Sequence, residues 1–117
     1  MTAGPGKDLQ AFLDALRELD GALDVNIRRA ERMKERIAEI QQALGAGASL
    51  RDVVPQESPP LIVELLTQSA EHLSAYGSRV RRTEARALHQ EGLTMEQIAQ
   101  LFGVTRQRVS TLLRDGS

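Results

Sequence analysis

The chain has 117 residues, of which 15 are basic and 16 acidic, so its formal net charge at pH 7 is −1. It contains no cysteine, which excludes disulfides, thiolate metal sites and cysteine nucleophiles. The N-terminus lacks the apolar run of a signal peptide, and no stretch is apolar enough to cross a membrane. We therefore expect a cytoplasmic protein without a membrane partner.

The charge is unevenly distributed along the chain. From Ser78 to the C-terminus seven arginines stand against four acidic residues, a net of +3, whereas residues 1–77 carry a net of −4. A basic end on an acidic chain points modestly to a polyanionic partner. On charge alone, an ordinary solvated surface is the simpler interpretation.

Residues 1–6 are predicted to form a flexible tail, and a helical region is predicted over residues 7–76. Up to residue 44, apolar residues recur every seven positions in two sets, three residues apart, and neither set contains a charge. This is the pattern of the a and d positions of a coiled coil, which predicts a dimerisation seam. The predicted seam residues are Leu9, Phe12, Leu16, Leu19, Leu23, Ala30, Met33, Ile37, Ile40 and Leu44.

Two residues leave open whether this is one helix or two. Gly21 interrupts the pattern, and glycine is unfavourable in a helix interior. Asn26 occupies a d position, where it can fix the register of a coiled coil or mark a turn between shorter helices. Leu13 and Ile27 widen the apolar stripe, which favours packing against more than one neighbour. The heptads are therefore either an intermolecular seam or an intramolecular core.

A connector rich in glycine and proline is predicted over residues 45–60. Ser49 is expected to cap a short turn, and Ser58 with the two following prolines is expected to start a further helix. Gly77 is expected to break or kink that helix. No strand pattern is present, so the predicted fold class is all-α.

A second domain is predicted over residues 78–115. A helix that ends at Gly92 is followed by Thr94 and Gln97, which form a capping box, and then by a short helix. Gly103 turns the chain and Thr105 caps the last helix. Two short helices joined by a tight glycine-containing turn, with a third helix before them, indicate a three-helix helix-turn-helix domain.

Residues 93–114, LTMEQIAQLFGVTRQRVSTLLR, resemble the helix-turn-helix of bacterial regulators. They are most similar to sigma factor region 4 and to the DNA-binding domains of resolvases and invertases. The likeness covers about 35 residues with the preceding helix, and the rest of the chain resembles neither family. The resemblance implies a DNA-binding domain, without the full activity of either family.

The side chains on the outer side of the predicted last helix suit double-stranded DNA. Arginine can donate two hydrogen bonds to guanine and glutamine can pair with adenine, and helix N-termini suit phosphates. Upstream arginines can follow the DNA backbone. The predicted DNA-binding residues are Arg81, Arg82, Thr94, Thr105, Arg106, Gln107, Arg108, Ser110, Thr111 and Arg114.

The sequence contains no arrangement of residues that predicts catalysis. His72 and His89 are far apart and have no acidic or cysteine partners at ligand spacing, so we expect no metal and no cofactor. No nucleophile–base arrangement, phosphate-binding glycine loop or carboxylate pair stands out, so we expect a protein that is not an enzyme.

These observations predict a small, nucleoid-associated transcription regulator that reads the major groove as a homodimer. An alternative is an adaptor that contacts RNA polymerase or another regulator through the coiled coil and the C-terminal domain. A third hypothesis is a nucleoid or plasmid-maintenance protein that binds DNA with little sequence preference.

Overall fold

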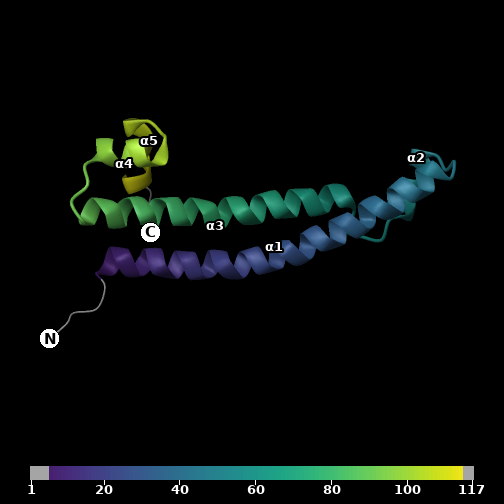
Figure 1. The fold of residues 1–117 in the computed structure, drawn as a ribbon, viewed down its shortest axis with the longest axis horizontal. Coiled ribbons are helices and arrows are strands. Elements are labelled where there is room, and N and C mark those ends of the chain that lie inside the picture. The colour runs from purple at the N-terminus through teal and green to yellow at the C-terminus, as the bar shows by residue number, and fades with distance from the viewer. Residues whose placement is uncertain (1–5, 115–117) are drawn as a thin grey trace. The chain divides into compact units, whose positions relative to one another are not determined.

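The structure, a computed structural model, describes residues 6–114. All regular secondary structure in this range is helical and no strand occurs in it, which confirms the all-α class. Of the predicted tail, only Gly6 lies within the described residues. The helices are α1 (Lys7–Gly45), α2 (Leu50–Val53), the 3-10 helix η1 (Val54–Gln56), α3 (Ile62–Gln90), α4 (Met95–Phe102) and α5 (Arg106–Arg114) (Figure 1).

α1 is one continuous helix, so neither Gly21 nor Asn26 divides it. Gly21 is exposed, and glycine at such a position opposes the helix by only about 1 kcal/mol relative to alanine. The amide oxygen of Asn26 accepts a hydrogen bond from the guanidinium of Arg29, one turn later. Once a helix has formed, each further residue adds a hydrogen bond, so the helix-forming residues on either side outweigh these two positions.

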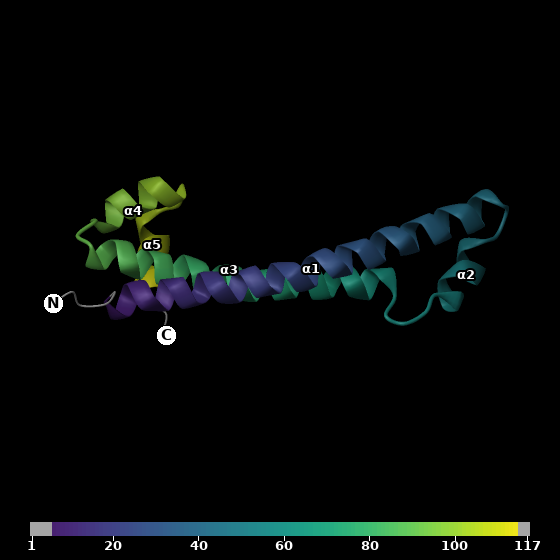
Figure 2. The ribbon, with the colours of Figure 1, turned by 60° about the horizontal axis from the view of Figure 1, so that its bottom comes forward.

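The described chain divides into two compact units, each of which contains part of α1 and part of α3. The first unit consists of the residues up to Asp20 together with those from Ala75 onward, and the second consists of Gly21–Ser74. Within each unit, the two helical stretches run antiparallel (Figure 1, Figure 2).

α3 differs from the sequence prediction at both Ser58 and Gly77. The helix begins at Ile62, not at Ser58, and its first amides are bonded by carboxylates. The Ile62 amide donates to Oε1 of Glu57 over 3.1 Å, and the Leu61 amide donates to Oε2 of Glu64 over 3.3 Å. α3 also runs through Gly77 without a break.

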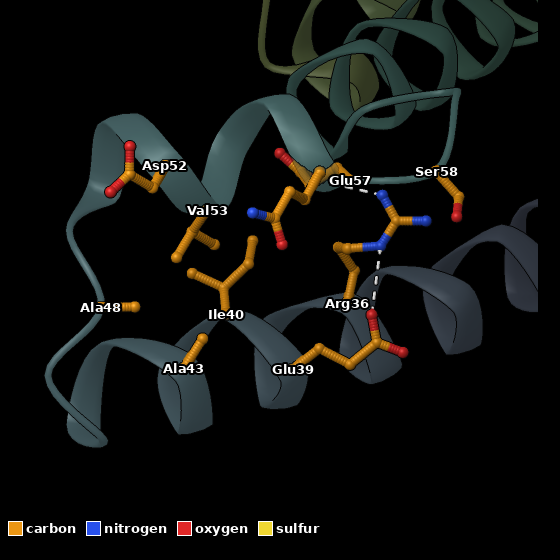
Figure 3. A pocket seen from close by; sticks show the side chains of 10 residues that line it. Arg36, Glu39, Ile40, Ala43, Ala48, Asp52, Val53, Glu57 and Ser58 are labelled. Carbon is orange, nitrogen blue, oxygen red and sulfur yellow. Dashed lines mark hydrogen bonds and ion pairs between the residues drawn. The ribbon is translucent and has the colours of Figure 1, made fainter.

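A buried ion pair joins α1 to the connector in the second unit. Nη1 of Arg36 lies 3.1 Å from Oε1 of Glu57, and the two side chains are 16% and 4% exposed. The same guanidinium lies 3.6 Å from Oε2 of Glu39 (Figure 3). It also donates to the carbonyl of Pro60. Ser49 precedes α2 as expected, but its side chain makes no capping hydrogen bond.

The two heptad sets of α1 have different environments. The set that contains Phe12, Leu19 and Met33 is half-buried, and the face is completed by Ala15 and Ala22, which are buried. The other set is mostly exposed. Its exposed members are Leu16, Leu23, Ala30, Ile37 and Leu44. Leu9 and Ile40, the remaining predicted seam residues, are half-buried. The inner face of α1 is therefore rotated away from the a/d seam that the sequence predicted.

The first unit has an apolar core in which α4 and α5 pack together. Its buried members are Ala85 from α3, Ile98 and Ala99 from α4, and Val109 and Leu112 from α5. Half-buried apolar residues surround them, and these are Leu88, Leu93, Met95, Phe102 and Leu113. The small side chains of Ala85 and Ala99 allow the three helices to approach closely, and α5 is thereby left with one buried and one exposed side.

Candidate nucleic-acid interface

The chain reverses direction between α3 and α4 through a left-handed glycine. Gly92 has φ +106°, a value that residues with a Cβ rarely adopt. The Leu93 amide donates to the Leu88 carbonyl over 3.1 Å, and the Gly92 amide donates to that of His89 over 3.0 Å. These two bonds form a Schellman motif, which satisfies the last carbonyls of α3 and fixes the start of α4.

The predicted capping box at the start of α4 is confirmed. The Gln97 amide donates to the Thr94 hydroxyl over 3.1 Å, and the Thr94 amide donates to Oε1 of Gln97 over 2.8 Å. Because the box uses the amide of Thr94, a phosphate at this helix start would meet the amides of Met95 and Glu96 instead.

A tight turn at Gly103 joins α4 to α5. Gly103 is left-handed with φ +67°, and the Val104 amide donates to the Ala99 carbonyl over 3.0 Å. The hydroxyl of Thr105 then accepts from the Arg108 amide over 3.0 Å, which confirms Thr105 as a cap of α5. Val104, which directly follows the turn glycine, is 39% exposed.

Six of the ten residues predicted to bind DNA lie on α5, and four of these six are exposed. Arg106, Gln107, Arg108 and Arg114 are exposed, as are the two capping threonines. The predicted residues Ser110 and Thr111 are half-buried. The hydroxyl of Thr111 donates to the Gln107 carbonyl of its own helix over 3.2 Å, so its remaining capacity is as an acceptor.

Arg106 lies beside the start of α4, at a shallow hollow that it lines together with His89, Thr94, Met95 and Glu96. The structure thus brings two predicted residues, Arg106 and Thr94, to one place. Nδ1 of His89 lies 3.0 Å from the Leu93 carbonyl; as a carbonyl oxygen only accepts, Nδ1 must carry the proton. His89 is not among the residues that the sequence predicted to bind DNA, although it lines this hollow with Arg106. Its position in the last turn of α3, shortly before the capping box, is the sequence feature that predicts a place near the start of α4.

Arg81 and Arg108 line a second hollow, between α3 and α5. Arg81 is exposed, and its guanidinium lies over Gly77, where a Cβ would come within 3.7 Å of Nη1. The other lining residues are Glu84, Phe102, Val104 and Leu112. The exposed face of α5 therefore has Arg81 beside it in one hollow and the imidazole of His89 in the other, with an acidic residue in each hollow.

The other arginines of α3 are less available than the sequence suggested. Arg79 forms an ion pair with Glu18 of α1. Arg82 and Arg86 are half-buried, and Nε of Arg82 is enclosed without a hydrogen-bond partner among the described residues. Arg81 is thus the best-placed of these side chains for a phosphate.

The fold and this face define an all-α protein whose last helix presents arginines and glutamine on its exposed side. Comparison with protein-family models, with curated proteins and with solved structures gives no match. Across residues 6–114, no helix is long and apolar enough to span a membrane, and no group of three or more potential ligand residues is placed to hold a metal.

Proposed function

We propose that this chain is a sequence-specific double-stranded DNA-binding transcription regulator that acts as a homodimer. In this proposal α3, α4 and α5 form a helix-turn-helix domain and α5 is its recognition helix. One observation carries the proposal: α5 buries Val109 and Leu112 while its first turn exposes Arg106, Gln107 and Arg108. A recognition helix enters the major groove with its N-terminal residues against the base edges.

The chemistry of that first turn suits the reading of bases. Arg106 and Arg108 can each donate two bonds to O6 and N7 of guanine, and Gln107 can pair with N6 and N7 of adenine. Each such pair discriminates against a wrong base by about 1–3 kcal/mol. Arg114, at the other end of α5, is better placed for a phosphate.

Phosphates would be held at the edges of the exposed face. The start of α4 offers amides beside Arg106 and His89, and the hollow between α3 and α5 offers Arg81 beside Arg108. Contacts of this kind position the protein on the duplex and make binding depend on salt.

The proposal is tested by selecting the purified full chain against a pool of random duplex DNA at near-physiological salt. We expect an inverted repeat with half-sites separated by one helical turn, about 34–36 Å, or a multiple of it. Recovery of DNA without a consensus would replace the proposal with an architectural protein that has little sequence preference. Recovery of nothing above background would reject DNA binding.

Two arginine variants separate base reading from phosphate contact. We expect Arg106→Ala to lower affinity for the selected site by about 1–3 kcal/mol while leaving binding to random DNA nearly unchanged. Arg81→Ala, the matched control, should weaken both DNAs alike and reduce the salt slope by about one. Fluorescence anisotropy over a salt series measures both. Equal losses on both DNAs from Arg106→Ala would contradict its assignment to a base.

One observation favours the adaptor as a second candidate. Leu101 on α4 is 66% exposed and lines a hollow with Leu93, Gln97 and Gln100. An exposed leucine among amides suits a protein contact, with RNA polymerase or another regulator as the partner. An adaptor should still bind its protein partner after Arg106→Ala and should lose it after Leu101→Asp. A DNA-binding regulator should lose its DNA site after Arg106→Ala and keep it after Leu101→Asp.

A further inference from the structure

The second unit exposes many large aliphatic side chains on α1 and α3. Nine large aliphatic side chains of this unit are at least 37% exposed, and six of them form the central part of one face. The six are Leu23, Ile27 and Ile37 on α1, and Val63, Leu66 and Leu73 on α3. Contiguous exposed apolar surface of this kind marks an interaction site in a soluble protein.

These six side chains share one face of the helix pair. On α1, Leu23 directly follows the buried Ala22, and on α3, Leu66 directly follows the buried Leu65. One position in the sequence rotates a side chain by about 100° around the helix. The two helices are antiparallel. A side chain one position after an inward-facing residue therefore points to the same side of the pair on both helices.

The other four members obey the same rule. Each of them directly follows a half-buried residue of its own helix. The pairs are Asn26 and Ile27, Arg36 and Ile37, Ile62 and Val63, and His72 and Leu73. The six residues therefore form one apolar face, which we name the 27/66 face.

Two charges on α1 indicate what covers this face. Asp20 and Lys34 are exposed and lie seven positions before and after Ile27 on the same helix. Residues seven apart lie on nearly the same side of a helix, two turns away. A second α1 placed antiparallel, with Ile27 opposite Ile27, brings each aspartate to a lysine. A parallel copy in register would instead place like charges together.

The centre of the α3 part of the face fits the same axis. Arg36 of α1 donates to the carbonyl of Pro60. Both helices rise by about 1.5 Å per residue, so the α3 residue level with Ile27 is near Ala70. Leu66 and Leu73 lie on either side of Ala70, and the small exposed side chain of Ala70 allows two α3 helices to approach closely.

We infer that the 27/66 face binds a second copy of this chain in an antiparallel, two-fold-symmetric arrangement, with the axis passing near Ile27 and Ala70. This inference rests on the self-association part of the proposed function and is independent of DNA. The dimer contact then lies on α3 and on the exposed heptad set of α1, which includes Leu23 and Ile37, and not on the predicted a/d seam. Phe12, Leu19, Met33 and Ile40 then belong to the inner face of α1.

The test is sedimentation equilibrium of the full chain without DNA, on charge variants. Asp20→Lys and Lys34→Asp should each raise the dimer dissociation constant at least tenfold, because each places like charges together twice. The double variant should return it to within threefold of the original. An equimolar mixture of the two single variants should form mixed dimers, because every charge is then opposite its complement.

Matched controls exclude a general charge effect. Glu35→Lys and Arg28→Asp make the same charge changes at exposed positions on another side of α1 and should leave the dissociation constant within threefold. Circular dichroism verifies that every variant remains helical.

Cysteine variants test the orientation directly, because the chain has no cysteine of its own. In the antiparallel dimer, Ile27→Cys should form a disulfide-linked dimer on oxidation and Asp20→Cys should not.

Three outcomes would overturn the inference. These are a chain that stays monomeric at all concentrations, single charge variants that associate like the original, and rapid crosslinking through Asp20→Cys. A dimer that passes these tests but selects no DNA would reject the DNA-binding proposal alone.

Discussion

Replacement of Ile98 by alanine is expected to lower the free energy of unfolding by about 2–5 kcal/mol. Ile98 is 0% exposed and lies in the core that joins α3, α4 and α5, so the truncation leaves a cavity among Ala85, Val109 and Leu112. The loss also removes the support that orients the exposed face of α5. Chemical denaturation of the full chain, followed by circular dichroism, measures the change.

The matched control for this variant is Leu101→Ala, on the same helix. Leu101 is 66% exposed, so its truncation removes little buried surface and should change the free energy of unfolding by no more than about 0.5 kcal/mol. Equal destabilisation by the two variants would show that Ile98 is not in a packed core.

Loss of the buried ion pair in the second unit is the other large expected effect. Arg36→Met leaves the carboxylate of Glu57, which is 4% exposed, without its cation. Breaking a buried pair by removing one partner typically lowers the free energy of unfolding by about 3–5 kcal/mol, because the remaining charge stays desolvated. The Ile62 amide still donates to Glu57, which places the expected value at the lower end. Urea denaturation at pH 7 measures it.

Two controls test this explanation. Arg17 forms an ion pair with Asp14 at the surface, with side chains 77% and 42% exposed, so Arg17→Met should change the free energy of unfolding by less than about 1 kcal/mol. The double variant Arg36→Met with Glu57→Gln should recover much of the stability, because the neutral amide needs no cation and still accepts from Ile62. Purely additive single effects would argue against the coupling of Arg36 to Glu57.

The local features of the first unit were predictable from short sequence windows. Thr94 and Gln97 are three residues apart, which is the spacing at which a capping box closes. The turn glycines Gly92 and Gly103 adopt the left-handed conformation that glycine favours. In α5 the apolar residues Val109 and Leu112 are three positions apart, the helical spacing that places both on one face. These features involve only neighbours in the chain, so the sequence alone determines them.

The limits of the helices depended partly on contacts between residues far apart in the chain. The prediction that α3 starts at Ser58 was wrong, because the Ile62 amide donates to Glu57 at the start of the helix. Glu57 is held there by Arg36, which lies 21 residues upstream. The break at Gly77 was wrong because the helix continues on both sides of it, with the Arg81 side chain over the glycine.

Only the tertiary structure decided which of the charged and apolar faces remain available. The heptads of α1 predicted a helix with a wide apolar stripe. The sequence of that stripe does not determine which side packs within the chain and which side stays exposed. Ala15 and Ala22 on one side of α1 are buried, whereas the heptad set that contains Leu23 and Ile37 is mostly exposed. Likewise, seven arginines near the C-terminus looked equivalent until the pairing of Arg79 with Glu18 and the partial burial of Arg82 separated them from Arg81 and Arg106. Periodicity fixes the direction of a side chain relative to its own helix, whereas exposure depends on what the rest of the chain places against it.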